Sequence, residues 1–440
     1  MANNTSTTQL VKADKINIFS FGTPQMKAFH ITWLTFFLCF FGWFGIAPLM
    51  PIIRDELHLT KGQIGNIMIS SVAITIFARL FIGWLCDKIG PRLAYTITLV
   101  VGAIPVIFIG FSNSYESFLL FRLAIGVIGA SFVITQYHTS VMFAPNIVGT
   151  ANATVAGWGN LGGGVTQMVM PIIFTAIVGL GYTQGESWRI AMTIPGVALL
   201  IMAVVYYKFT QDCPQGNLLE LRKTDPEFRA KAADIEGSFK LALKDYRVWI
   251  LFLAYGCSFG MEITMDNIAA LYFTDNFHLD LKTAGIFAGL FACMNLFARA
   301  LGGIFSDKLS KTFGMKGRTT LLAVCILVEG FGIMLFTQMQ EVHWAVISMI
   351  GFALFIKMAN GASYSIVPFV NNKALGSVAG IVGAGGNVGA VFFAYLLKNE
   401  NATYQESLYL IGCIVAVISG FCLFLKFEDK KVESKKAVLA

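Results

Sequence analysis

Twelve long apolar stretches run along this chain, and they constrain its fold more than any other feature of the sequence. A helix of roughly 20 apolar residues is long enough to cross the hydrocarbon core of a bilayer. The stretches cover residues 28–50, 64–86, 93–113, 117–141, 151–178, 190–210, 247–274, 283–305, 320–337, 344–367, 376–398 and 404–426. We therefore expect an all-α membrane protein with twelve transmembrane helices.

Charged residues are too few for a water-soluble protein of this size. Of the 440 residues only 32 are Lys or Arg and 25 are Asp or Glu, whereas about a quarter of a soluble domain is charged. So few polar groups could not cover the surface of a soluble globule. The first 27 residues lack the apolar region and cleavage site of a signal peptide, so we expect the first stretch to remain in the mature protein.

The distribution of Lys and Arg predicts how the chain lies in the membrane. With twelve helices both tails share one side, and that side holds 23 Lys and Arg, against five in the opposite loops. Because cytoplasmic loops are enriched in these residues, we expect cytoplasmic tails at 1–27 and 427–440 and a cytoplasmic central loop at 211–246. This bias accounts for the net charge of +7, so we expect contact with membrane lipid and no binding of nucleic acid.

An internal repeat divides the chain into two six-helix halves, at residues 28–210 and 247–426. The pattern F-A-R-x-x-x-G-x-x-x-D-K occurs around Arg79 and again around Arg299, 220 residues or half the chain length later. The tetrapeptide G-N-x-G at residues 159–162 likewise recurs 227 residues later. A carrier built from two such repeats has its binding site between them, near the middle of the membrane.

Four basic residues lie inside the apolar stretches: Arg79, Arg122, Arg299 and Lys357. An intramembrane charge costs at least ~2.5–3.5 kcal/mol on insertion scales, so each needs a partner or a function. Arg79 precedes the cytoplasmic Asp87 by eight residues, or ~12 Å of helix, which puts it close to the midplane of a ~30 Å core. Either each arginine snorkels or pairs structurally, or Arg79 and Arg299 together bind a small planar anion, which their rigid fork of donors suits.

Four side chains follow one face of the seventh stretch at positions i, i+4, i+7 and i+11: Tyr255, Phe259, Glu262 and Asp266. An aromatic stripe at this spacing is more often helix packing than ligand contact. Carboxylates inside a span are either proton carriers or partners of embedded cations such as Lys357, and the sequence leaves both roles open. His138 could likewise titrate or be a packed, hydrogen-bonded residue.

Glycines concentrate in the fifth and eleventh stretches, and the candidates for close helix packing are Gly157, Gly159, Gly162, Gly383, Gly386 and Gly389. Residues 157–162 match the dinucleotide fingerprint G-x-G-x-x-G, but they lie within an apolar helix that no strand precedes. Small residues instead let transmembrane helices approach closely and slide, as two rocking halves require. Asn160 and Asn387 lie among these glycines and need hydrogen-bond partners, either an anion or each other.

No pattern in the sequence indicates a metal site, a cofactor or catalysis. Its eight Cys include no C-x-x-C pair and its five His are scattered, so we expect neither a metal site nor a disulfide framework. It contains no nucleophile and base constellation and no Walker-type loop. We therefore expect neither an enzyme nor an ATP-driven pump, and no cofactor.

Several motifs resemble those of a known family. Gly83-x-x-x-Asp87-Lys88-x-Gly90-Pro91-Arg92 resembles the loop signature after the second helix of the major facilitator superfamily, and Arg122-x-x-x-Gly126 resembles its fourth-helix motif. Residues 156–167 and 383–389 resemble the paired signatures of the nitrate/nitrite porter family within it. The resemblance implies the major facilitator fold, with two pseudo-symmetric halves, and gating or packing roles for Gly83, Asp87 and Arg92.

The same resemblance assigns the residues of the binding site. It implies that Arg79 and Arg299 clamp nitrate between the two halves. Phe132 and Phe259 would enclose the anion from either side. The hydrogen-bond donors to the anion would be Tyr255, Asn160 and Asn387.

The resemblance also bears on coupling. Residues 255–267 are most similar to plant and algal high-affinity nitrate transporters, a branch associated with proton symport, but the chain departs from the family pattern at His138, at Lys357 and after Gly389. We expect a monomeric secondary transporter of nitrate, and of nitrite, in the cytoplasmic membrane, working by alternating access and proton symport. The coupling candidates are Glu262, Asp266, Lys357 and His138. The alternatives are nitrate/nitrite exchange, another small anion as substrate, and a non-transporting nitrate sensor.

Overall fold

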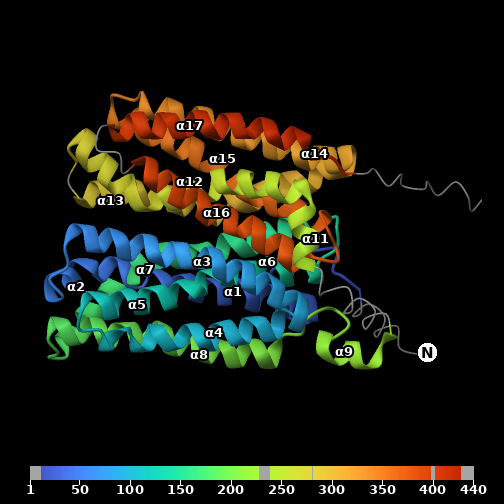
Figure 1. Ribbon diagram of the computed structural model, residues 1–440, viewed down its shortest axis with the longest axis horizontal. Helices are drawn as coiled ribbons and strands as arrows, with labels where there is room; N and C mark the ends of the chain where they lie inside the picture. Colours follow the sequence, from blue (N-terminus) through green and yellow to red (C-terminus); the bar gives the residue numbers. More distant parts are fainter. Residues whose placement is uncertain (1–10, 227–237, 280, 398–401, 428–440) are drawn as a thin grey trace, which may run out of the picture.

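The computed structural model describes residues 11–226, 238–279, 281–397 and 402–427, and helices make up most of them. Figure 1 shows the long helices side by side in one bundle, with the first half of the chain (blue to green) beneath the second half (yellow to red). Within the described ranges there is no strand, only two isolated bridges. The expected all-α fold is confirmed.

Among the residues described, the first half of the chain contains eight α-helices. Their bounds are α1 Pro24–Phe44, α2 Met50–Glu56, α3 Lys61–Ile89, α4 Pro91–Phe108, α5 Tyr115–Gly126, α6 Ser131–Met142, α7 Val148–Gly179 and α8 Gln184–Phe209. A short 3-10 turn joins α5 to α6, so that these two form one apolar span. Ser or Thr N-caps with a partner three residues on begin α3, α5 and α8, and they satisfy backbone donors that would otherwise be free.

The second half of the chain repeats this arrangement. Its helices are α12 Tyr246–Phe277, α13 Leu281–Cys293, α14 Ala298–Thr337, α15 Val342–Ile366, α16 Leu375–Leu397 and α17 Tyr404–Phe421. Two short helices of the central segment, α9 Leu218–Thr224 and α11 Ser238–Lys244, lie at the end of the bundle opposite α2 and α13 (Figure 1).

Helix α14 contains a sharp turn that makes it part of two membrane crossings. The span Gly289–Thr337 is 49 residues long, although roughly 20 suffice to cross a bilayer. Gly314 interrupts it with a φ of 58°, a left-handed conformation that favours glycine. Arg318 Nη1 then lies 2.7 Å from Asp307 Oδ1, whereas a separation of 11 positions would span ~16 Å of straight helix. Divided at Gly314, this segment turns the eleven apolar spans of the described residues into the twelve predicted from sequence.

The two halves meet where α3 packs on α16 and where α7 packs on α14. Both contacts depend on glycine. A Cβ on Gly83 would lie 2.3 Å from the carbonyl oxygen of Gly376, and a Cβ on Gly303 would lie 2.3 Å from that of Gly149. Only small residues permit backbones to approach this closely. The close approach brings α3 and α14, which carry the two repeat-related arginines, to the interface between the halves.

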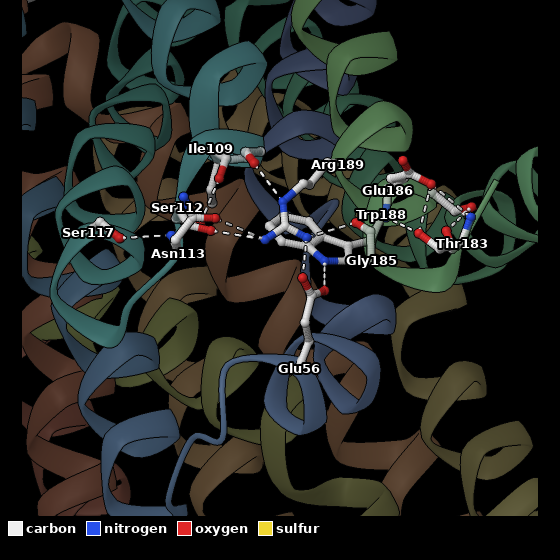
Figure 2. A network of polar contacts seen from close by, with 12 residues as sticks. Glu56, Ile109, Ser112, Asn113, Ser117, Thr183, Gly185, Glu186, Trp188 and Arg189 are labelled. Atoms are coloured by element: carbon white, nitrogen blue, oxygen red, sulfur yellow. Dashed lines mark hydrogen bonds and ion pairs between the residues drawn. The ribbon is translucent and has the colours of Figure 1, made fainter.

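A polar network holds the end of the first half near α2 (Figure 2). Arg189 of α8 donates from Nε to the Gly110 carbonyl at 2.7 Å and from Nη2 to the Ser112 carbonyl at 3.2 Å. Its Nη1 pairs with Glu56 of α2, and Glu56 also accepts from Trp188 Nε1 at 2.6 Å. This arginine, one of the five basic residues predicted for the outer loops, therefore joins α2 and the end of α4 to α8.

Candidate functional site

Arg79 of α3 is fully buried at the interface between the halves. Its Nε donates to the Gly129 carbonyl at 3.3 Å, and its Nη1 donates to the carbonyl of Gly383 in α16 of the other half. Its Nη2 has no hydrogen-bond partner and no carboxylate pairs with it among the described residues. A buried cation with a free N–H is costly, so this guanidinium is a candidate contact for an anion.

Arg299 of α14 is also buried, but it is better paired. Its Nη2 lies 2.6 Å from Glu262 Oε2 of α12. With its oxygen turned toward Arg299, the Asn160 amide of α7 accepts from Nη1 at 3.2 Å and from Nη2 at 3.0 Å. The Nε of Arg299 has no hydrogen-bond partner in the described part of the chain. Both arginines therefore keep one unused buried donor.

Three aromatic rings pack around the two guanidiniums. Phe132 of α6 lies nearly parallel to Tyr255 and Phe259 of α12, with centroid distances of 5.7 and 6.1 Å. The Arg79 guanidinium lies 5.2 Å from the centroids of both Phe132 and Phe259, and the Arg299 guanidinium lies 5.9 Å from that of Phe259. The structure therefore brings the predicted arginine pair and the three predicted aromatic residues into one buried cluster.

The aromatic cluster is closed in this conformation. A flat ion between two parallel rings needs roughly 7 Å, twice the ~3.5 Å contact distance, whereas the Phe132 and Phe259 centroids are 6.1 Å apart. The rings must part slightly to admit a ligand between them. The buried Tyr255 hydroxyl interacts electrostatically with both guanidiniums but makes no hydrogen bond of normal geometry among the described residues, which leaves it available to a ligand.

Tyr364 of α15 completes the cluster, although sequence reasoning missed it. Its ring meets Phe132 and Tyr255 edge-on at 4.7 and 5.0 Å, and its hydroxyl donates to the Ala379 carbonyl at 3.0 Å. The signal in the sequence was weak, a phenol between Ser363 and Ser365 inside an apolar stretch.

Glu262 of α12 is a partner of embedded cations in this structure. Its Oε1 lies 2.8 Å from Lys357 Nζ of α15 and accepts from Asn295 at 2.8 Å. Its Oε2 accepts from Arg299 at 2.6 Å and from Asn360 at 2.5 Å. Four donors on three other helical segments thus surround one carboxylate. Sequence reasoning left this pairing open and did not find Asn295 or Asn360, which are single amides in apolar stretches.

The other coupling candidates lie in different surroundings. Lys357 is fully buried and lies 4.3 Å from the Phe291 ring centroid as well as against Glu262. The Asp266 side chain, one turn beyond Glu262 on α12, is exposed. His138 of α6 is buried and bonds to Tyr206 at 2.5 Å and to the Gln211 carbonyl at 2.8 Å. It is a packed residue of the first half, with no contact to the arginine pair among those bonds.

The two predicted asparagines do not play equivalent roles. Asn160 bonds to Arg299 across the interface. Asn387 of α16 is buried, but its amide nitrogen donates to the Val72 carbonyl of α3 at 3.4 Å, and its Oδ1 has no partner among the described residues. Asn160 and Asn387 therefore bond to different partners and not to each other.

The predicted glycines lie at close helix contacts. A Cβ on Gly157 would lie 2.7 Å from the Asn295 carbonyl oxygen, and Cβ atoms on Gly159 and Gly162 would lie 2.0 and 2.1 Å from atoms of α1. A Cβ on Gly389 would lie 1.9 Å from the Gly256 carbonyl oxygen, and one on Gly383 would lie 2.9 Å from the Tyr364 hydroxyl. These positions let α7 approach α1 and let α16 approach α12.

Gly386→Ala should weaken ligand binding without removing any bonding group. Its Cβ would lie 2.5 Å from Phe259 Cδ1 and 2.9 Å from Tyr255 Cε1, so both rings must move. Overpacking of this kind costs about 1–3 kcal/mol, and we expect the half-saturating concentration of substrate in a transport assay to rise roughly tenfold. Gly351→Ala, where a Cβ meets nothing within 4 Å, is the control. Equal half-saturation in both variants would contradict the assignment.

Two aspartates connect the two halves by hydrogen bonds at one end of the bundle. We call the contacts of Asp87 and of Asp307 the two latches. Asp87 of α3 accepts from the backbone N–H groups of Gly376 and Ser377, each at 3.0 Å, at the start of α16. Its repeat equivalent Asp307 accepts from the N–H groups of Gly149 and Thr150, at 3.2 and 2.6 Å, at the start of α7. A carboxylate at a helix N-terminus is favourable for both hydrogen bonding and the helix dipole. Each half thus caps a helix of the other, which closes this end.

Arg92 lies beside the first latch but within its own half. Its backbone N–H donates to Asp212 Oδ1 and its Nε donates to the Tyr207 carbonyl, both at 2.8 Å. Gly90 turns the chain here with a φ of 87°, and a Cβ on it would lie 2.5 Å from the Asp212 carboxyl carbon. Burial raises the pKa of Asp212 above its ordinary value, although its bonds to Arg92 and Leu218 oppose this.

Comparison with known proteins gives consistent results. The model of the Major Facilitator Superfamily matches residues 32–394. High affinity nitrate transporter 2.5 of Arabidopsis thaliana is 41% identical over 416 residues, which cover 94% of this chain and 82% of that protein. Nitrate/nitrite transporter NrtP of Picosynechococcus sp. is 29% identical, over 93% of this chain and 96% of that protein.

Solved structures show the same fold. The transporter FucP in its outward conformation aligns with a TM-score of 0.69 at 13% identity, over 92% of this chain and all of that chain. The proton:xylose symporter XylE aligns with a TM-score of 0.68 at 13% identity, over 91% of this chain and 95% of that chain. At such identities the likeness concerns the arrangement of helices.

Proposed function

Since this chain belongs to the major facilitator superfamily, we propose that it is a secondary carrier that moves nitrate, and also nitrite, across the membrane by alternating access. Relatives that are named nitrate transporters, one of them 41% identical, support nitrate as the substrate. The candidate contacts for the anion all come from one chain, which supports a monomer as the working unit.

The observation that carries this proposal is the buried arginine pair. Among the described residues no carboxylate pairs with Arg79, and both Arg79 and Arg299 have an N–H without a hydrogen-bond partner close to the Phe259 ring. A small planar anion would offset the charge of Arg79 and accept from both guanidiniums and from the Tyr255 hydroxyl. Nitrate is flat, singly charged and delocalised over three oxygens, so it fits donors that lie around an aromatic face.

The latches suggest how access alternates. The Asp87 and Asp307 contacts close the end that bears α9 and α11, and the bias of Lys and Arg supports a cytoplasmic position for that end. In this orientation the closed conformation releases nothing to the cytoplasm. Separating the two latches together would open that end, because each bonds a residue of one half to a helix start of the other.

Uphill uptake requires an energy source, and we propose proton symport. Moving one negative charge inward against 100 mV, inside negative, costs about 2.3 kcal/mol. A proton that moves with nitrate cancels this electrical cost. The competing coupling is nitrate/nitrite exchange, and the complete pairing of Glu262 favours it, because no titration of that carboxylate is then required.

Transport by purified protein in liposomes tests the proposal. We expect liposomes loaded with nitrate to take up labelled nitrate by counterflow, and external nitrite to compete with it. Binding of nitrate without flux would instead indicate a sensor, and flux of another anion that nitrate does not inhibit would indicate a different carrier. Imposing a pH gradient and internal nitrite separately then identifies the coupling, since only the true coupling gradient should accumulate nitrate.

A further inference from the structure

Besides Glu262, the carboxylate of Glu329 is buried in the part of α14 that follows Gly314. Its side chain is fully buried, and neither Oε1 nor Oε2 has a hydrogen-bond partner among the described residues. Glu262, by contrast, is surrounded by four donors. Buried carboxyl groups in native proteins are nearly always hydrogen-bonded, so the isolation of Glu329 requires an explanation.

Glu329 faces the interior of the second half. It lies on the same helix face as Ile326 and Ile333, which are both fully buried. Two turns further on, the Phe336 ring packs on Tyr272 of α12 at 4.7 Å and on Phe352 of α15 at 5.4 Å. This face of α14 is therefore enclosed by α12 and α15, the helices that carry Glu262 and Lys357.

The ionisable groups around Glu329 are few. Glu262 and Lys357 act on it electrostatically from α12 and α15. The Glu329 carboxyl group also interacts electrostatically with the thiols of Cys257 on α12 and Cys325 on α14. From α17 the Cys413 thiol contacts Met334 at 3.5 Å, and the turn after α17 contributes the buried Cys422. Lys357 is the cation that acts on Glu329, and it is already paired with Glu262 at 2.8 Å.

These surroundings require Glu329 to be neutral in this conformation. An ionised carboxylate that is buried without a cation or a hydrogen-bond donor is disfavoured, and the group binds a proton instead. A cation that approached it would reverse this preference. Lys357 is the candidate for this cation, because it lies on α15, which packs on α14, and a movement that separates it from Glu262 would allow it to pair with Glu329.

We propose that Glu329 is the proton-binding group that couples this carrier to the pH gradient, with Lys357 exchanging between Glu262 and Glu329. The inference rests on the proposed nitrate transport. In the closed conformation Glu329 is a carboxylic acid. After the change of conformation it loses its proton to the water on the new side, and the remaining carboxylate pairs with Lys357.

The two coupling candidates on α12, Glu262 and Asp266, suit this role less well than Glu329. Glu262 accepts from three hydrogen-bond donors and pairs with Lys357, which leaves it no free position for a proton, whereas the Asp266 side chain is exposed in this conformation and is not buried away from water as Glu329 is. Only a carboxylate whose surroundings change with conformation can couple proton binding to transport. In the proposed cycle Glu329 meets this condition, because Lys357 pairs with it in one of the two conformations and with Glu262 in the other.

The test separates nitrate exchange from proton-driven uptake in liposomes that contain the full chain. Exchange at equal pH needs no net proton transfer, while accumulation driven by a pH gradient does. We expect Glu329→Gln to retain nitrate counterflow and to lose accumulation driven by the pH gradient. Glu406→Gln, at the exposed N3 position of the capping box of α17, where either Glu or Gln is suitable, is the matched control and should retain both activities.

Each outcome decides the proposal. Accumulation by Glu329→Gln at the wild-type level overturns it, as does loss of counterflow together with accumulation. If the Gln variant does not fold, Glu329→Asp keeps a carboxyl group, and its accumulation should show a shifted pH midpoint; an unchanged midpoint overturns the proposal. Wild-type counterflow without pH-driven accumulation overturns this inference alone, whereas absent wild-type counterflow overturns the proposed function itself.

Discussion

Arg79→Lys is expected to reduce nitrate counterflow in liposomes by about two orders of magnitude. The side chain keeps its charge but loses the planar fork, and one ammonium cannot replace both the bond to the Gly129 carbonyl and the bond to the Gly383 carbonyl. Losing a buried, charge-assisted contact of this kind costs about 2–5 kcal/mol, and each 1.4 kcal/mol is roughly tenfold.

Arg299→Lys should give a loss of similar size for a different reason. Its guanidinium bonds to both Glu262 and Asn160 while it keeps Nε free, and an ammonium cannot do all three. Arg54→Lys is the control, because Arg54 is half-exposed and its ion pair in the described part of the chain is with its neighbour Asp55. Counterflow at the wild-type rate in both site variants would show that the arginine pair does not hold the anion.

Glu262→Gln is expected to cause the largest loss of stability. The substitution removes the carboxylate that pairs with both Arg299 and Lys357, at 2.6 and 2.8 Å, in a site where all three side chains are buried. Breaking a buried pair by removing one partner costs about 3–5 kcal/mol, because the remaining charge is left uncompensated. Thermal unfolding in detergent measures the effect.

A second variant distinguishes this electrostatic cause from a packing defect. Combining Glu262→Gln with Lys357→Met removes one stranded cation and should recover a substantial part of the lost stability. A double variant that is no more stable than Glu262→Gln alone would contradict the explanation. So would a melting temperature of Glu262→Gln equal to that of the wild type.

Much of the architecture could be predicted because its causes are local in the sequence. An apolar stretch of membrane-spanning length must form a helix whatever its neighbours are, and the expected spans correspond to those in the structure. The turn between the eighth and ninth stretches could not be read from the structure's apolar spans alone, because there the two stretches form a single span of 49 residues. Only the backbone at Gly314 and the contact from Arg318 to Asp307 divide it.

Only part of the candidate site could be predicted from the sequence. The repeat identified Arg79 and Arg299, and applied once more it would have identified Asp307 as the equivalent of Asp87. The partners of Glu262 could not be found this way, because Asn295, Asn360 and Lys357 come from segments with no common pattern. Asn387 repeats the motif of Asn160 but bonds to Val72 instead of an arginine.

The sequence by itself determined that the chain crosses a membrane many times and that one motif repeats in its two halves, and it predicted two arginines near the middle of the bilayer. These conclusions follow from apolar length, from repetition and from the cost of an intramembrane charge, which do not depend on distant contacts. Only the tertiary structure decided that Glu262 accepts from three hydrogen-bond donors and pairs with Lys357, while neither carboxyl oxygen of Glu329 has a partner among the described residues. Which donors meet a carboxylate depends on how helices rotate and cross, and that is fixed by packing between segments far apart in the chain.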